Sequence, residues 1–240
     1  MKLHIVFFAL FVILGCQPDV NSADNPCSES KEAKTKAKKL HPSLQKVYDN
    51  PDFVDVSNYP HVKVELRYAT ENNFMKTNVY GEFTVCFLHK EAATKLKKAT
   101  QNLQEVKPGW KLLLLDCLRP RSVQRKLYEY VFGTDQQKYV ANPDRGSIHN
   151  YGFAVDLTLV DENEIEVDMG TEFDSFTKLA QPRLEKQMLT ENQLTQAQHA
   201  NRLILRNSMV DAGFRQLSFE WWHYDAANAS TVRKNYQILE

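Results

Sequence analysis

The sequence predicts a single α+β domain in which helices flank a small mixed or antiparallel sheet. Segments with the alternation of strands and segments with the apolar spacing of helices both occur, but they do not alternate strictly along the chain. The 240 residues are 42% hydrophobic and 25% charged, which is typical of a globular chain with one sizeable core.

The first half of this domain offers three clear elements. Residues 62–68 alternate apolar and charged side chains, as a half-buried strand does. Residues 90–106 carry apolar side chains at helical spacing, and a Pro-Gly pair follows them. Residues 111–116 form a short apolar run that favours a strand buried on both faces.

Four further elements are expected in the second half. A helix over 120–132 begins with a proline, which is tolerated in the first helical turn. Residues 153–160 have the pattern of another strand. A helix over 196–212 is closed by Gly213. The last strand-like segment lies within 214–224.

The N-terminal segment has the features of an export signal. Lys2 precedes an apolar run of about ten residues, roughly half of what a bilayer-spanning helix needs. Cys16 directly after a glycine resembles the lipobox of bacterial lipoproteins, in which this cysteine is lipidated. Two acyl chains there are enough for stable anchoring. A simple signal peptide and a buried apolar strand are the alternatives.

These features divide the chain into a lipoprotein signal peptide (1–15), a polar tether (16–45) and the folded domain (46–240). We therefore expect an exported protein attached to a membrane through lipidated Cys16. Gln17 is not an inner-membrane retention signal of the aspartate type. In a cell with two membranes this favours the periplasmic face of the outer membrane.

The composition also excludes some functions. Lys and Arg number 30 and Asp and Glu number 30, so the formal net charge is zero and no nucleic-acid partner is expected. The four cysteines form no C-x-x-C pair, which argues against a thiolate zinc site.

Two short segments, 147–156 and 220–223, hold the residues most suited to chemistry. They contain two imidazoles and two carboxylates, the inventory of a catalytic zinc site that keeps one position open. The candidate metal ligands are His149, Asp156 and His223, and the candidate general base is Glu220.

The spacing of these residues limits the interpretation. On an ideal strand, Glu220 and His223 would face opposite sides of the sheet, so a turn or bulge is required between them. Gly152 likewise indicates a bend or a close backbone approach. Because a single histidine is more often a structural residue than a ligand, the spacing alone leaves both interpretations open.

The motifs Ser-x-His-x-x-x-x-Ala-x-Asp at 147–156 and Glu-x-x-His at 220–223 resemble those of zinc DD-peptidases of the bacterial cell wall. Further segments are similar to the VanX-type D-alanyl-D-alanine dipeptidases in the same order along the chain. These segments are Leu66-Arg67-Tyr68-Ala69-Thr70, Asp116-Cys117-Leu118-Arg119-Pro120, Asp168-Met169-Gly170-Thr171-Glu172-Phe173-Asp174 and Ser218-Phe219-Glu220-Trp221-Trp222-His223-Tyr224.

The resemblance implies one Zn²⁺ per chain, held by His149, Asp156 and His223, with Glu220 as the general base. It gives Arg119 the role of stabilising the oxyanion that develops during attack, for which a rigid guanidinium is well suited. A surface ion pair is the alternative for Arg119.

The resemblance also implies which residues bind the two ends of a dipeptide. Tyr68 and Asp174 match residues at the amino end, and Ser147 matches one near the carboxyl end. A core tyrosine, an Asx-turn and a loop hydroxyl are the respective alternatives. Some family members carry a tyrosine where this chain has Glu82, and Tyr80 is a candidate substitute.

A second departure from those members is Cys117-Leu118, which stands where they have Gly-Tyr before the arginine. Export to an oxidising compartment allows a disulfide between Cys86 and Cys117. Such a bond would tie the arginine-bearing segment to its neighbour.

The resemblance implies zinc-dependent hydrolysis of D-Ala-D-Ala in wall-peptide turnover or precursor depletion. The alternatives are a carboxypeptidase or endopeptidase acting on longer wall peptides and a non-catalytic wall-binding lipoprotein. Trp221 and the long segment 161–196 between the two motifs favour the dipeptidase, because such a segment can wall off the site. Glu220 argues against a non-catalytic protein, since a structural metal site needs no base.

Overall fold

A computed structural model of the chain describes residues 42–81 and 83–240. The expected signal peptide, Cys16, most of the tether and Glu82 lie outside the described residues. Residues Leu40–Glu240 make up one compact unit, which the following account concerns. Helix α1 (Pro42–Tyr48) spans the position, residue 45, at which the sequence places the end of the tether. Within the described part, no helix is long and apolar enough to cross a membrane.

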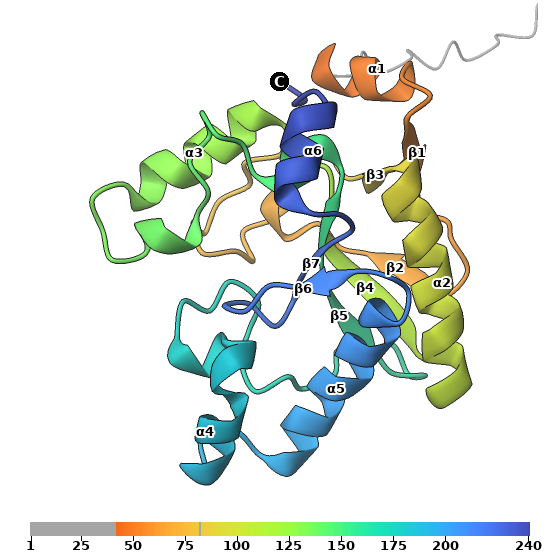
Figure 1. Ribbon diagram of the computed structural model, residues 1–240, viewed down its shortest axis with the longest axis vertical. Coiled ribbons are helices and arrows are strands. Elements are labelled where there is room, and N and C mark those ends of the chain that lie inside the picture. The colour runs from red at the N-terminus through yellow and green to blue at the C-terminus, as the bar shows by residue number, and fades with distance from the viewer. Residues whose placement is uncertain (1–41, 82) are drawn as a thin grey trace, which may run out of the picture. The chain divides into compact units, whose positions relative to one another are not determined.

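The centre of the unit is a five-stranded mixed sheet with the order β2-β4-β5-β7-β6 (Figure 1). Strands β2 and β4 run parallel, and the other neighbouring pairs run antiparallel. Two further strands, β1 and β3, pair antiparallel in a small separate sheet. The seven strands are β1 (Phe53–Asp55), β2 (Val62–Val64), β3 (Phe87–His89), β4 (Lys111–Asp116), β5 (Ala154–Val160), β6 (Arg215–Gln216) and β7 (His223–Asp225).

Helices surround the sheet, which confirms the predicted α+β class (Figure 1). The α-helices after α1 are α2 (Lys90–Val106), α3 (Arg121–Val131), α4 (Glu185–Thr190), α5 (Gln196–Val210) and α6 (Ala229–Asn235). Short 3-10 helices lie in the connections: η1 (Arg67–Ala69), η2 (Gln137–Tyr139), η3 (Ile148–Tyr151), η4 (Lys178–Ala180) and η5 (Pro182–Leu184). The three long helices predicted from the sequence are confirmed to within two residues at each end, and Gly213 after α5 has the expected positive φ of 93°.

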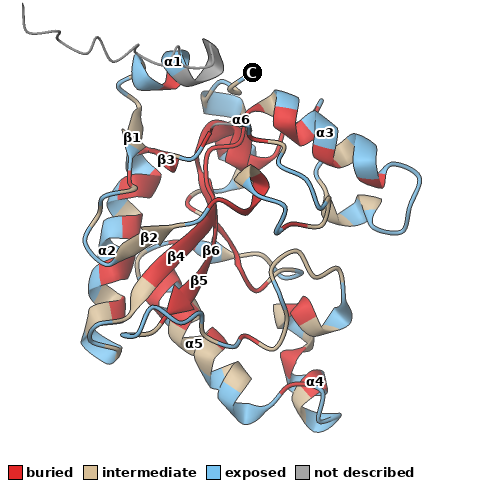
Figure 2. Ribbon diagram, turned by 180° about the vertical axis from the view of Figure 1, so that it is seen from behind, coloured by how far each residue is buried: buried red, intermediate tan, exposed pale blue. Residues whose placement is uncertain are grey.

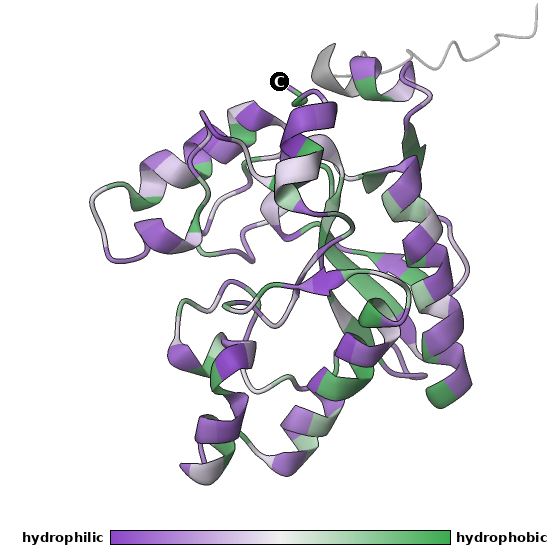
Figure 3. Ribbon diagram, viewed as in Figure 1, coloured by the Kyte–Doolittle hydropathy of each residue, from purple (hydrophilic) through white to green (hydrophobic). Residues whose placement is uncertain are grey.

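Strands β4 and β5 are the buried centre of the unit (Figure 2). All seven residues of β5 are buried, and both strands are among the most hydrophobic parts of the chain (Figure 3). One face of β4, with Leu112 and Leu114, belongs to the large core to which α2 and α5 contribute Leu96 and Leu205. The other face forms a smaller cluster that includes Phe173 from the long segment 161–196. The sheet is therefore covered on both sides.

Two predicted strands are wrong in extent. The segment 62–68 is a strand only to Val64, because the chain then turns into η1, where the Asn73 side chain donates to the Arg67 carbonyl oxygen. The segment 214–224 is two short antiparallel strands, β6 and β7, joined by a loop rather than one strand. Both turns bring side chains to the site described below.

Candidate active site

The register of the sheet brings the central site residues into one row. Asp156 on β5 lies opposite His223 on β7, and on the other side it lies opposite Asp116 on β4. A register irregularity between Leu114 and Asp116 re-aims the end of β4. The strands thus place two carboxylates and an imidazole side by side.

His149 reaches the same place from the short helix η3, which precedes β5. The helix ends at Gly152 in the left-handed conformation, with φ of 71°. A Cβ there would lie 2.8 Å from the backbone nitrogen of His89, so only glycine fits. The bend indicated by Gly152 in the sequence is therefore present, and it turns the chain from His149 into the strand that carries Asp156.

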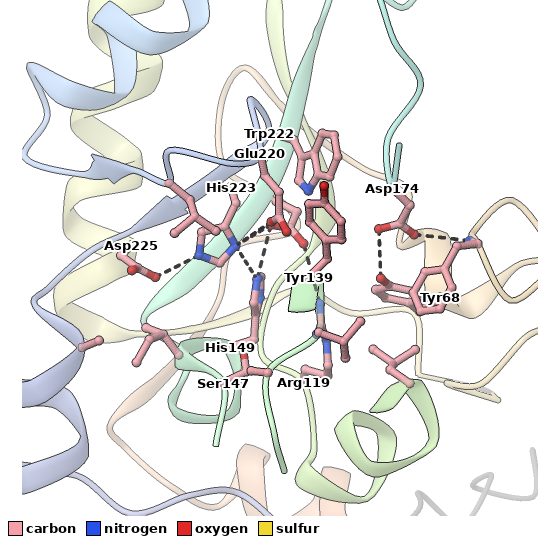
Figure 4. Close-up of a pocket in the computed structure, with 18 of the residues that line it drawn as sticks. Tyr68, Arg119, Tyr139, Ser147, His149, Asp174, Glu220, Trp222, His223 and Asp225 are labelled. Atoms are coloured by element: carbon pink, nitrogen blue, oxygen red, sulfur yellow. Dashed lines mark hydrogen bonds and ion pairs between the residues drawn. The ribbon is translucent and has the colours of Figure 1, made fainter. Parts of the chain in front are cut away.

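Three potential ligand atoms, one from each of His149, Asp156 and His223, form a compact triangle (Figure 4). The His149 Nε2 lies 3.1 Å from the His223 Nδ1 and 3.3 Å from the Asp156 Oδ1, and the third side is 2.9 Å. Tetrahedral zinc with bonds of about 2.0–2.1 Å places its ligand atoms about 3.3 Å apart. The triangle therefore fits a divalent ion with one open coordination position.

Hydrogen bonds behind the imidazoles orient both rings toward the centre of the triangle. The His149 Nδ1 lies 2.8 Å from the Cys117 carbonyl oxygen, and the His223 Nε2 lies 3.0 Å from the Asp225 carboxylate. Because both partners accept hydrogen bonds, those nitrogens carry the protons. The other nitrogen of each ring is left with a free lone pair for a metal, the arrangement typical of metal-binding histidines.

The electrostatics of the triangle also favour a cation. Although burial lowers the pKa of His223, the charges and hydrogen bonds of Asp225 and Asp156 outweigh it and raise that pKa well above the usual value. Burial raises the pKa of Asp156, but His149 and His223 lower it far more. Positive charge is thus stabilised at this point, whether it is a proton or a metal ion.

Glu220 lies beside the triangle on the loop between β6 and β7. Its Oε2 is 4.0 Å from the His223 Nδ1, and its side chain is 13% exposed. The Gln216 side chain donates to the Trp221 carbonyl oxygen and holds this loop. The loop is the turn that the spacing required, since it frees Glu220 from strand geometry. Burial raises the pKa of Glu220 to about 7.

Arg119 is buried at 7% exposure rather than being a surface ion pair. Its Nε and Nη2 donate to the Asp116 carboxylate, and its Nη1 donates to Gln124. The Nη2 lies 3.7 Å from the Asp156 carboxylate. The guanidinium is therefore fixed beside the triangle, with N–H groups left over for a ligand.

Tyr68 and Asp174 face one another at one end of the same pocket (Figure 4). The Tyr68 hydroxyl donates to Asp174 at 3.1 Å, and the Phe74 backbone N–H donates to the other carboxylate oxygen at 3.4 Å. Asp174 has a positive φ of 61°, which is uncommon for a residue other than glycine. Burial, followed by the charge of Asp156, raises the pKa of Asp174 well above its usual range.

Ser147, near the other end, also lines the pocket, and its backbone N–H donates to the Asn150 side chain. The structure joins Cys86 and Cys117 by a disulfide, which ties β3 to the segment that carries Arg119. Tyr80 does not face the pocket, because its hydroxyl donates to the buried Asp116. Its expected role as a substitute near the substrate is therefore wrong.

Several residues of the site were not identified from the sequence. Asp225 holds His223, and Asp116 with Gln124 holds Arg119. Asp225 could have been predicted as a neighbour of His223, since residues two apart on a strand share a face. Tyr139 and Phe176 stack at 5.2 Å on one wall, and no pattern in the sequence relates them.

The pocket enclosing these groups has a volume of about 280 Å³. The site combines two imidazoles and a carboxylate around one point with a buried carboxyl and an arginine beside them. These are the components of a metal-dependent hydrolase site. The α+β domain and this site together define that class of protein.

Comparison with known proteins places the chain within the class. It belongs to the peptidase family described as D-ala-D-ala dipeptidase, which matches residues 49–239. The D-alanyl-D-alanine dipeptidase of Escherichia coli is 32% identical over 184 residues, which cover 76% of this chain and 89% of that protein. The protein of the same name from Enterococcus faecalis is 30% identical over 181 residues, covering 68% and 85%. The family resemblance predicted from the motifs is confirmed.

Proposed function

We propose that this protein is a zinc-dependent dipeptidase that hydrolyses D-Ala-D-Ala. The observation that carries the proposal is the ligand triangle with Glu220 beside it and Arg119 fixed 3.7 Å from one ligand. The names of the relatives, which are D-alanyl-D-alanine dipeptidases, support the substrate.

His149, Asp156 and His223 would hold the zinc ion through two nitrogens and one oxygen. Zinc supplies a Lewis acid there and lowers the pKa of a coordinated water to about 7. Asp225 and the Cys117 carbonyl keep the two imidazoles in the tautomers that ligation needs.

Glu220 accepts the proton of the attacking water and delivers it to the amine that leaves. A pKa near 7 suits both steps, because a base of that strength takes up and releases a proton at neutral pH. Only this carboxyl among the pocket acids combines proximity to His223 with freedom from a strong hydrogen bond to another described side chain.

Arg119 stabilises the negative charge that develops on the peptide oxygen during attack. The hydrogen bonds to Asp116 and Gln124 hold the guanidinium in place before the substrate arrives, so no reorganisation is needed in the transition state. Its backbone is fixed too, since the Arg119 N–H donates to the His149 carbonyl oxygen at 3.1 Å.

Asp174 and Tyr68 hold the free ammonium of the substrate, and Ser147 lies near its carboxylate. Burial disfavours the charged form of Asp174. The ammonium of a substrate would be the cationic partner that offsets this cost. The aromatic side chains of Phe74, Tyr139 and Phe176 pack against one another and form one wall of the pocket. This wall favours a dipeptide over the longer wall peptides that a carboxypeptidase would cleave.

We further propose that the protein is exported and anchored through lipidated Cys16, and that it acts in wall-peptide turnover or precursor depletion. The signal-like residues 1–15 support export, and the Cys86–Cys117 disulfide accords with an oxidising compartment. Mass spectrometry of the protein from membranes tests this: a diacylated N-terminal Cys16 is expected, and an unmodified Met1 contradicts it.

The activity is tested on the purified full-length protein with its metal content measured on the same sample. We expect about one zinc per chain, cleavage of D-Ala-D-Ala, and loss of that activity on chelation with recovery on adding Zn²⁺. Cleavage of a wall pentapeptide but not of the dipeptide would reject the dipeptidase in favour of a carboxypeptidase.

A further inference from the structure

Two arginines line the pocket on the side of Ser147 and have no role in the mechanism above. Arg145 comes two residues before Ser147, and Arg233 comes from helix α6. The Arg233 Nη2 donates to the Gly146 carbonyl oxygen at 3.1 Å, which holds this side chain against the segment that carries Ser147. Arg145 and Arg233 are called the arginine pair below.

The positive charge of the arginine pair is not neutralised within the described residues. Neither guanidinium lies within 4 Å of a carboxylate there, and the buried Nε of Arg233 has no hydrogen-bond partner. The acid that faces them, Asp225, already accepts a hydrogen bond from His223 at 3.0 Å. Burial and then the charge of Arg145 lower the pKa of Arg233, as expected for two cations held near one another.

The opposite end of the pocket has the opposite character. Tyr68 and Asp174 lie on one side of the two histidines, and Asp225, whose charge acts on Arg233, lies on the other (Figure 4). Within the described residues, Asp174 has no ion-pair partner. The pocket therefore has an unpaired acid at one end and two unpaired cations at the other, with the metal ligands between them.

We propose that Arg145 and Arg233 bind the terminal carboxylate of the substrate and so fix the direction in which a zwitterionic dipeptide lies. The inference rests on the proposed dipeptidase function and adds the residues that select a free carboxyl end. Some family members carry a tyrosine where this chain has Glu82. Tyr80 does not take its place, because its hydroxyl donates to Asp116, and the arginine pair would supply the missing donors. Guanidinium groups suit this task, since their fork of N–H donors matches a carboxylate.

The test compares D-Ala-D-Ala with D-Ala-D-alaninamide, which lacks the carboxylate charge, on the zinc-loaded full-length protein. The wild type is expected to show a lower KM for the acid than for the amide. Arg233→Gln should raise the KM for the acid about 10-fold to 100-fold and leave the KM for the amide nearly unchanged, because a charge-assisted hydrogen bond is lost. Arg233→Lys should retain part of the preference.

Two further variants keep the test independent of folding. Arg145 is exposed and its side chain makes no hydrogen bond within the described residues, so Arg145→Gln should fold normally and reduce the same preference by a smaller factor. Lys234→Gln removes the same charge from an exposed neighbour on α6 and should leave the preference unchanged. The inference would be overturned if each of these two arginine variants changed the KM for the acid and the KM for the amide by the same factor.

Calorimetry on the Glu220→Gln protein separates this inference from the proposed function. If the wild type cleaves no dipeptide but Arg233→Gln still weakens binding of the acid selectively, the arginine pair is a carboxylate site and the proposed function fails. If the wild type cleaves the dipeptide and the arginine variants bind acid and amide as before, the function stands and the inference fails. No binding of the acid at all overturns the inference.

Discussion

The metal-ligand region and the substrate-facing wall of this pocket are built in different ways. Asp156 and His223 lie opposite one another on paired strands, and each of the two imidazoles has a second partner behind it. Asp174 instead lies on an irregular segment with positive φ, and its two hydrogen bonds come from Tyr68 in η1 at 3.1 Å and from the turn at Phe74 at 3.4 Å. The sheet thus fixes two of the three metal ligands, while the connections between strands determine which substrate reaches them.

The largest expected effect comes from removing one of the three metal ligands. His149→Ala leaves two ligand atoms, so we expect the zinc content to fall to near zero and kcat/KM to fall by more than about 10⁴-fold, beyond the loss of an acid–base group alone. Atomic absorption and a dipeptide assay on the same sample check this. Full zinc occupancy with unchanged activity would place the metal elsewhere.

Glu220→Gln should remove the proton transfer and keep the metal. We expect kcat to fall about 10²–10⁴-fold with zinc content unchanged, the usual contribution of a general base. Because the base acts only when deprotonated, kcat/KM of the wild type should fall about tenfold per pH unit below a pKa of about 7. If the Glu220→Gln variant showed the same fall of kcat/KM at low pH, that fall would belong to another group.

The disulfide ties β3 to the segment that carries Arg119, beside the metal ligands. Its removal in the double variant Cys86→Ala/Cys117→Ala should lower the free energy of unfolding by about 3 to 4 kcal/mol, given the 31-residue separation of the cysteines. Urea unfolding measures this, and the reduced wild type is the matched control. Equal stability of the oxidised wild type and the double variant would contradict the bond.

A substitution at Asp225 tests whether the hydrogen bonds behind the imidazoles contribute to zinc affinity. Asp225→Asn removes the charge that the His223 Nε2 contacts at 3.0 Å, so we expect zinc affinity to fall about 10- to 100-fold. Competition with a chromophoric chelator gives the affinity. Asp211→Asn, the same change at the exposed C-cap of α5, is the matched control and should have no effect.

The same contrast explains how much was predictable from the sequence. The ligands and Glu220 lie in two short motifs, and the apolar runs around them predict the strands that carry them. Asp116, which holds Arg119, and the arginine pair could not be assigned in this way. Their roles depend on hydrogen bonds and charges between segments that only the folded chain brings together, such as the bond from Arg233 to Gly146.

The smallest effect is expected on the substrate-facing wall. Tyr68→Phe deletes the hydroxyl that donates to Asp174 at 3.1 Å but keeps the ring that packs over Arg119 at 5.0 Å. Loss of one such hydrogen bond raises the KM for D-Ala-D-Ala about 2- to 12-fold, with kcat largely kept. Steady-state kinetics measure both constants. A fall in kcat with an unchanged KM would mean that Tyr68 acts on the reacting bond through Arg119, and the division between the metal-ligand region and the substrate-facing wall would then fail at this residue.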